Sequence, residues 1–286
     1  MQPASSQYQR HQLAFDGRQR RYIIHTPESP DGRLLIGLHG ATQRGSIMAR
    51  TSGFADLPQA AGMTLVFPDA VNGIWRDGRD EDDDVDDVGF IEALIDQLLG
   101  SHSLREDAIF LVGVSNGGFL SQRLVFELEG RFRAVATLIA TMGLRTFQHA
   151  FVDAVPSLYL IAGTADPIIP FTGGTTPNSL MASADASILG FDDLVQHWKQ
   201  MGRFHACSQQ YRSDTSGLKI IEENCHADSG QLLRATVVEG GGHQWYGRKV
   251  SDDTIRQFGA TTRRFKVSED ILAFFLQVPP LRGHRD

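Results

Sequence analysis

The 286-residue chain carries a net charge of −7 at pH 7, and 41% of its residues are hydrophobic, a composition typical of a globular protein. It is long enough for one large α/β domain or two small ones. The acidic balance argues against nucleic acid or an anionic membrane surface as the main partner, and no apolar run approaches the roughly 18 residues needed to span a bilayer.

Apolar patterning and turn residues predict alternating strands and helices. Strands are predicted at residues 11–15, 18–26, 34–38, 64–67, 109–114, 134–140, 157–161 and 235–238, and helices at 52–61, 88–98, 116–129, 188–200 and 268–277. The first two strands flank Asp16-Gly17, a two-residue hairpin signal. The alternation indicates βαβ units and a mainly parallel sheet flanked by helices. Since no linker or repeat is visible, we expect residues 1–286 to form one domain.

An acidic stretch separates the fourth strand from the next helix. Its eight acidic residues are Asp77, Asp80, Glu81, Asp82, Asp83, Asp84, Asp86 and Asp87. We favour a solvated loop whose last aspartates cap the helix that follows. A calcium site is the alternative, but the spacing does not follow the pattern of an EF-hand loop.

The sequence Gly113-Val114-Ser115-Asn116-Gly117 follows an apolar run and precedes a helix-compatible segment. This is the G-x-S-x-G nucleophile elbow in the context that it requires: a strand, a sharp turn and a helix. The glycines allow neighbouring backbone to approach, and the helix N-terminus favours negative charge beside the serine. The alternative is a Gly-rich turn whose serine only caps the helix.

A nucleophilic serine needs a base and an acid that orients the base, and both are expected beyond the C-terminal ends of strands. Asp166 follows the strand predicted at 157–161, and His243 follows the last predicted strand, after three glycines. The chain order Ser115, Asp166, His243 is that of an α/β-hydrolase.

Hydrogen-bond donors for an oxyanion are expected from the amides of Asn116 and of Ala41, in the loop after the first buried strand. His39 is expected to hold that loop, and is also a candidate substrate contact. The aromatic faces of Trp75 and Trp245 are further candidates for binding substrate, although core packing is an equal alternative for Trp75.

Two cysteines occur, Cys207 and Cys225, with His205 and His226 close to them in the sequence. From the residues alone, a disulfide and two free thiols are equally compatible with this arrangement. A zinc site with two thiolates and two histidines ranks well behind, because the spacing matches none of the common zinc motifs.

Six motifs together carry a resemblance to a known family over nearly the whole chain. They lie at residues 38–40, 67–69, 85–90, 113–118, 163–170 and 241–245. The chain resembles the secreted poly(3-hydroxybutyrate) depolymerase-like and feruloyl esterase-like α/β-hydrolases of the LpqC type. The resemblance implies a triad of Ser115, Asp166 and His243, and an oxyanion hole formed by Ala41 and Asn116.

The resemblance further implies a serine hydrolase that cleaves carboxylic esters through an acyl-enzyme. We expect a small-molecule or polymeric substrate carrying a short hydroxyalkanoate, acetyl or feruloyl ester. We expect no cofactor, no metal, no nucleic-acid partner and no membrane insertion; the oligomeric state stays open. The alternatives are a non-catalytic binding protein on a hydrolase fold, or a peptidase or amidase.

The resemblance also implies export to the periplasm or the medium and favours a Cys207–Cys225 disulfide. The polar N-terminus, which lacks an apolar signal core, would by itself indicate the cytoplasm. Two positions depart from the family pattern: members often have cysteine where Ala41 stands, and proline where Tyr246 stands. Tyr246 is therefore expected to reshape the mouth of the pocket.

Overall fold

A computed structural model describes residues 8–79, 85–176, 187–213 and 217–279. In these residues, ten strands form one sheet in the order β1-β2-β4-β3-β5-β6-β7-β12-β11-β10. These strands are β1 (Gln9–Phe15), β2 (Arg18–His25), β3 (Leu34–Leu38), β4 (Thr64–Pro68), β5 (Ile109–Val114), β6 (Ala134–Leu138), β7 (Ser157–Gly163), β10 (His205–Ser213), β11 (Lys219–His226) and β12 (Leu232–Glu239). Strands β8 (Gly174–Thr175) and β9 (Ser187–Ile188) form a separate short pair.

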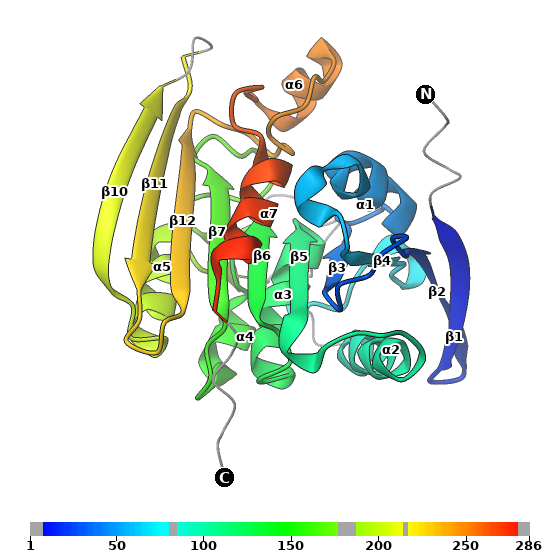
Figure 1. Ribbon diagram of the computed structural model, residues 1–286. Coiled ribbons are helices and arrows are strands. Elements are labelled where there is room, and N and C mark those ends of the chain that lie inside the picture. The colour runs from blue at the N-terminus through cyan, green and yellow to red at the C-terminus, as the bar shows by residue number, and fades with distance from the viewer. Residues whose placement is uncertain (1–7, 80–84, 177–186, 214–216, 280–286) are drawn as a thin grey trace.

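The six central strands, from β4 to β12, are parallel to one another, whereas β1, β2, β10 and β11 pair in antiparallel fashion. The sheet is therefore mainly parallel, as predicted, with an antiparallel hairpin at each side (Figure 1). From β3 the chain continues to β4 on one side, and from β5 it continues to β6 on the other. Ligands of open α/β sheets bind at such a switch point, beyond the C-terminal ends of the strands.

Among the residues that the structure describes, seven helices accompany the sheet, together with short 3₁₀ turns. They are α1 (Gly45–Ser52), α2 (Asp87–Ser101), α3 (Asn116–Glu127), α4 (Leu144–His149), α5 (Phe191–Met201), α6 (Asp252–Phe258) and α7 (Val267–Gln277). Helices α1 and α7 pack on one face of the sheet and α2, α3 and α5 on the other (Figure 1). Successive residues of β3 accordingly belong to different cores, Leu34 and Ile36 to one and Leu35 to the other. None of the described helices combines the length and apolar character needed to cross a membrane.

The β1–β2 hairpin forms where Asp16-Gly17 predicts it. Phe15 pairs with Arg18, and both turn residues have positive φ, as a two-residue hairpin turn with matching twist requires. The helix predicted at 52–61 is wrong: α1 ends at Ser52, and short 3₁₀ turns follow.

The acidic stretch is only partly the solvated loop that we expected. Asp86 caps α2 by accepting a hydrogen bond from Gly89 N–H at 2.8 Å, as predicted. Asp87 is instead buried, where it pairs with Arg20 and accepts a hydrogen bond from Arg76 N–H. Asp77 is also buried, in an ion pair with Arg79. Residues 80–84 lie outside the described residues.

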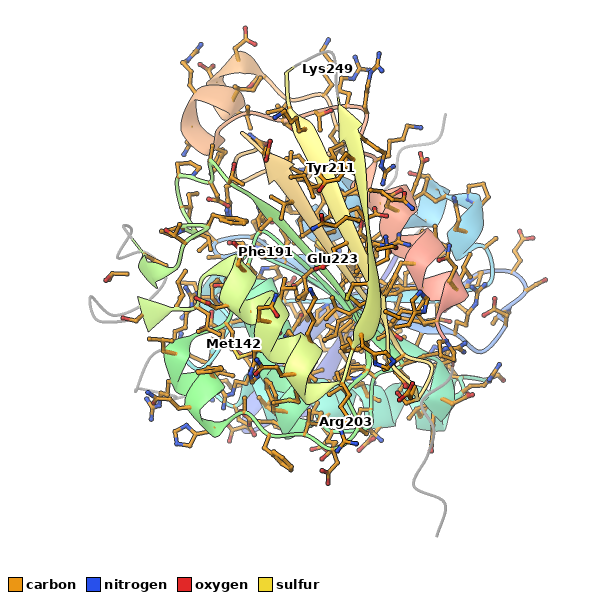
Figure 2. All side chains as sticks on the ribbon, turned by 90° about the vertical axis from the view of Figure 1, so that its left-hand side faces the viewer. Met142, Phe191, Arg203, Tyr211, Glu223 and Lys249 are labelled. Atoms are coloured by element: carbon orange, nitrogen blue, oxygen red, sulfur yellow. A yellow bond between two sulfur atoms is a disulfide. The ribbon has the colours of Figure 1, made fainter. Side chains whose placement is uncertain are left out.

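Strands β10 and β11, which extend the sheet beyond β12, were not predicted from the sequence. Figure 2 looks onto this edge, with Tyr211 on the outermost strand. Cys207 and Cys225, on these two neighbouring strands, form a disulfide. The sulfur atoms are therefore bonded to each other and unavailable as the zinc ligands of the alternative interpretation.

The disulfide gives a first testable consequence. Thiol titration of the denatured, unreduced protein should find no free thiol. Because the bond closes a loop of about 19 residues, the Cys207→Ser/Cys225→Ser double variant should lose about 3 kcal/mol of stability, measured by chemical denaturation. Cys225 pairs with Leu233 at the start of β12, the end of that strand remote from His243, so kcat should stay unchanged. Two titratable thiols in the native protein would contradict the bond.

Candidate active site

Ser115 occupies the turn between β5 and α3. Its φ of 53° and ψ of −122° lie in a region that residues with a side chain rarely adopt, and such strain typically amounts to about 1–3 kcal/mol. The backbone is held in place by hydrogen bonds from Ser115 N–H to Leu138 O and from Gly118 N–H to Ser115 O. The turn therefore has the geometry of a nucleophile elbow, with the serine ahead of the first turn of a helix.

His243 bridges Ser115 and Asp166. Its Nδ1 lies 2.7 Å from Asp166 Oδ2, and its Nε2 lies 3.0 Å from Ser115 Oγ. Because a carboxylate can only accept, the proton of a neutral imidazole belongs on Nδ1. Nε2 is then free to accept the hydroxyl proton of Ser115. Asp69 and Asp87 are engaged elsewhere, with Gly45 N–H and Arg20 respectively.

Asp166 follows β7 and is fixed at both carboxylate oxygens. Oδ1 accepts hydrogen bonds from Ile168 N–H and Ile169 N–H, each at 2.8 Å, while Oδ2 faces His243. The carboxylate is 2% exposed, so the interaction with His243 is shielded from water. This arrangement orients the imidazole.

His243 is placed by the loop after β12. Its backbone N–H donates to Phe258 O, and Gly242 N–H donates to Ala260 O, which anchors the loop to the segment around α6. A side chain at residue 242 could not fit, because its Cβ would lie 2.1 Å from Phe258 O. The loop can approach that segment only with glycine there.

Tyr246 lies away from the mouth of the pocket, contrary to our expectation. It is 1% exposed, and its hydroxyl donates to Gly242 O at 2.7 Å. Burial, and secondarily the charge of Asp166, raise the pKa of Tyr246 well above its usual range, so it remains a donor. Tyr246 therefore braces the His243 loop from beneath.

The two amides expected to form an oxyanion hole flank the elbow. Ala41 lines the same cavity as Ser115, and a Cβ on Gly40 would lie 3.5 Å from Ser115 Cβ, which shows how closely the two loops approach. Among the described residues, no acceptor takes the backbone N–H of Ala41 or of Asn116. Both donors are thus left for a ligand.

His39 supports this loop and does not line the pocket. It is fully buried; its Nε2 accepts from Ala70 N–H at 3.1 Å and its Nδ1 lies 2.7 Å from Gly40 O. Since Ala70 N–H must donate, Nδ1 carries the proton and donates to Gly40. Burial lowers the pKa of His39, in keeping with a neutral ring. The expected substrate contact is corrected to a structural one.

Trp75 is likewise buried, at 1% exposure, and outside the pocket. Its Nε1 donates to His39 O at 3.0 Å, and its backbone N–H and C=O both bond the side-chain amide of Asn116. One residue therefore ties together the two loops that carry the candidate oxyanion donors. We correct its role from substrate contact to brace.

The brace continues through Asp77. Its Oδ2 accepts from Asn116 Nδ2 at 2.6 Å, and the same carboxylate forms a buried ion pair with Arg79. The Arg79 guanidinium stacks over the Phe119 ring at 4.0 Å. The side chain of Asn116 thus has three partners on the 75–77 segment, so its backbone is held rigidly beside Ser115.

A cavity of about 480 Å³ opens beside Ser115 and His243. Trp245, a predicted contact, lines it, together with several apolar side chains that sequence analysis did not identify: Met48, Val114, Ile139, Ile168, Val250 and Phe258. They come from five separate segments of the chain, and although Val114 and Ile168 lie within sequence motifs, nothing in those motifs indicated that their side chains line a pocket. Arg248 is the one side chain other than His243 in this lining that can carry charge.

No family model matches the sequence. Among curated proteins, the chain is 28% identical to NocK of Nocardia uniformis subsp. tsuyamanensis, over 93% of this chain and 81% of that protein. The name of NocK describes it as an inferred esterase. It is 30% identical to feruloyl esterase C of Emericella nidulans, over 55% of this chain and 58% of that protein.

Solved structures share the fold. An acetyl xylan esterase from Aspergillus awamori aligns with a TM-score of 0.55 and 12% identity, over 82% of this chain and 94% of that chain. Esterase PE8 aligns with a TM-score of 0.55 and 15% identity, over 90% of this chain and 97% of that chain. Together with the sheet topology, these similarities show that the chain has the α/β-hydrolase fold.

Proposed function

We propose that this protein is a serine esterase that hydrolyses carboxylic esters through an acyl-enzyme. The observation that carries the proposal is His243, which lies within hydrogen-bond distance of Ser115 Oγ on one side and Asp166 on the other. Esterase relatives and esterases of the same fold support the reaction class. A continuous ten-stranded sheet supports one domain for the described chain.

The first half of the reaction transfers the acyl group. Ser115 Oγ attacks the ester carbonyl while His243 Nε2 accepts its proton, and Asp166 stabilises the imidazolium. The amides of Ala41 and Asn116 hold the oxyanion, each contributing about 3 kcal/mol to the transition state. When the intermediate collapses, His243 returns the proton to the departing alcohol. Water then repeats these steps on the acyl-enzyme and releases the acid.

The size and lining of the cavity support the proposal that the substrate has a small or planar acyl group. The volume of the cavity falls in the range of small-molecule sites, and most of its surface is apolar, with Trp245 and Phe258 among the residues that line it. Acetyl, hydroxybutyryl and feruloyl groups would fit such a cleft. The names of two relatives, feruloyl esterase C and acetyl xylan esterase, support the same range.

We also propose that the protein works outside the cytoplasm. The Cys207–Cys225 disulfide supports this, because disulfides persist in oxidising compartments and are rare in the cytosol.

Ser115→Ala should lower kcat on p-nitrophenyl acetate by about 10⁴-fold or more, since the nucleophile is lost while the fold is kept. Circular dichroism checks the fold, and Ser101→Ala, at an exposed serine on α2, is the matched control. A fluorophosphonate should label Ser115 alone, as peptide mass spectrometry would show. Retained activity or labelling at another residue would refute the assignment.

Asn116→Ala should lower kcat and kcat/KM together, by about 10- to 100-fold. Without its side-chain hydrogen bonds, the backbone N–H of residue 116 would be misplaced, and this donor acts on the oxyanion, which forms only in the transition state. Gln122→Ala is the matched control: Gln122 is a buried amide on the same helix, bonded to Trp198 and Thr137 away from the pocket. That variant should lose stability but keep kcat. A rise in KM alone for Asn116→Ala would contradict the positioning role.

Activity on p-nitrophenyl esters should be highest for acyl chains of roughly two to four carbons. Each methylene that does not fit the cleft reduces transition-state binding by about 1–3 kcal/mol. Measuring kcat/KM from acetate to laurate tests this expectation. A maximum at twelve carbons would mean that the cleft accommodates long lipid chains.

A further inference from the structure

A row of basic clefts leads away from the candidate active site. Arg248 lines the cavity beside Ser115 and also a second cleft of about 490 Å³, which contains Arg10 and Arg50. A third cleft, of about 450 Å³, shares Arg10 with the second and adds Arg21 and Arg44. We call these five arginines, Arg10, Arg21, Arg44, Arg50 and Arg248, the arginine track.

The fold fixes the spacing of the track. Arg44 is the N-cap of α1 and Arg50 lies in its last turn, six residues or about 9 Å apart along the helix axis. Arg10 and Arg21 lie on β1 and β2, and they form a diagonal cross-strand pair because Arg10 is opposite Ile23 and Arg21 opposite Gln12. Side chains on such a diagonal reach the same side of the sheet.

The arginines of the track have no carboxylate partner among the residues that the structure describes. All five are exposed, and none forms an ion pair with a described residue. Arg248 Nη1 instead donates to the carbonyl oxygens of Arg50 and Thr51, which anchors its guanidinium at the C-terminal end of α1.

Few opposite charges offset the track. Asp56 and Asp69 are the acidic residues in the linings of the two outer clefts, against five guanidinium groups. Asp69 Oδ1 already accepts a hydrogen bond from Gly45 N–H. A strip of positive charge with no ion-pair partner in the described part of the chain therefore exists on a protein whose net charge is −7.

We propose that the track binds the anionic portion of an oligomeric substrate, a carboxylate-bearing chain whose ester enters the cavity beside Ser115. This rests on the proposed function and names a substrate class for the same site. The planar guanidinium group matches a carboxylate with two parallel hydrogen bonds. Several guanidinium groups spaced along one surface match an oligomer with repeated carboxylates, such as a uronic-acid oligosaccharide, better than a single anion.

The overall charge favours a short acidic oligomer over a long polyanion or an anionic membrane. Salt at 0.1 M screens charges that lie more than about 10 Å apart. A short acidic oligomer bound on the track therefore interacts mainly with the nearby arginines. An extended nucleic acid or a lipid surface also meets the rest of an acidic protein and is repelled.

Binding can be tested without turnover. Calorimetric titration of the full-length wild-type protein should show that tetragalacturonate binds and that neutral cellotetraose binds at least about tenfold more weakly. In Arg10→Gln/Arg21→Gln/Arg44→Gln, affinity for tetragalacturonate should fall on the order of tenfold, as expected for three exposed ion pairs. Arg105→Gln/Arg256→Gln, at two exposed arginines outside the track, is the control and should keep the wild-type affinity.

Hydrolysis forms a separate test. Acetylated tetragalacturonate should have a higher kcat/KM than acetylated cellotetraose, and the difference should shrink in the triple variant and at high salt. Equal affinity for tetragalacturonate and cellotetraose, or an unchanged affinity of the triple variant for tetragalacturonate, would overturn the proposal that the track binds an anionic oligomer. So would tighter binding of a tetranucleotide or of phosphatidylglycerol vesicles than of tetragalacturonate. Binding as expected with no hydrolysis of either acetylated oligomer or of p-nitrophenyl acetate would instead refute the esterase proposal.

Discussion

The candidate site depends on direct backbone contact between the start of α3 and the strands beside it. A Cβ on Gly117 would lie 2.5 Å from Leu38 O, and a Cβ on Gly113 would lie 2.2 Å from Gly117 O. Only glycine permits such an approach, and the approach sets the distance between the elbow and the loop of Gly40 and Ala41. The nucleophile and both candidate oxyanion donors are therefore positioned by the sheet itself.

Buried polar groups below the surface hold the two loops in register. Trp75 and Asp77 supply the partners of Asn116, and Trp75 also bonds His39 O. Each of these groups would destabilise the fold if its partners were removed, because buried donors and acceptors must be satisfied. This dense bonding gives the site its rigidity, while apolar atoms form most of the surface of the cavity beside it.

The sequence was enough to predict the central strands and the order of Ser115, Asp166 and His243. Each of these three residues closely follows an apolar run that forms a strand of the sheet. Helix α1 was misplaced since its first amide, Gly45 N–H, is capped by Asp69, 24 residues away, rather than by a local residue. Strand β10 was missed because all its described side chains are exposed and show no apolar alternation. Trp75 and His39 do lie beside the site, but a sequence does not tell whether a loop side chain points into a pocket or beneath it.

The conformation of Ser115 has a consequence for how such a protein responds to selection. A positive φ with ψ near −122° is a conformation that glycine adopts far more easily than serine, so the elbow holds the hydroxyl in place at the expense of the folded state. Selection for heat tolerance alone would favour glycine in place of that serine, and the protein would then lose its proposed nucleophile. The heat tolerance of the native chain thus stays below what its core could support, for as long as turnover is retained.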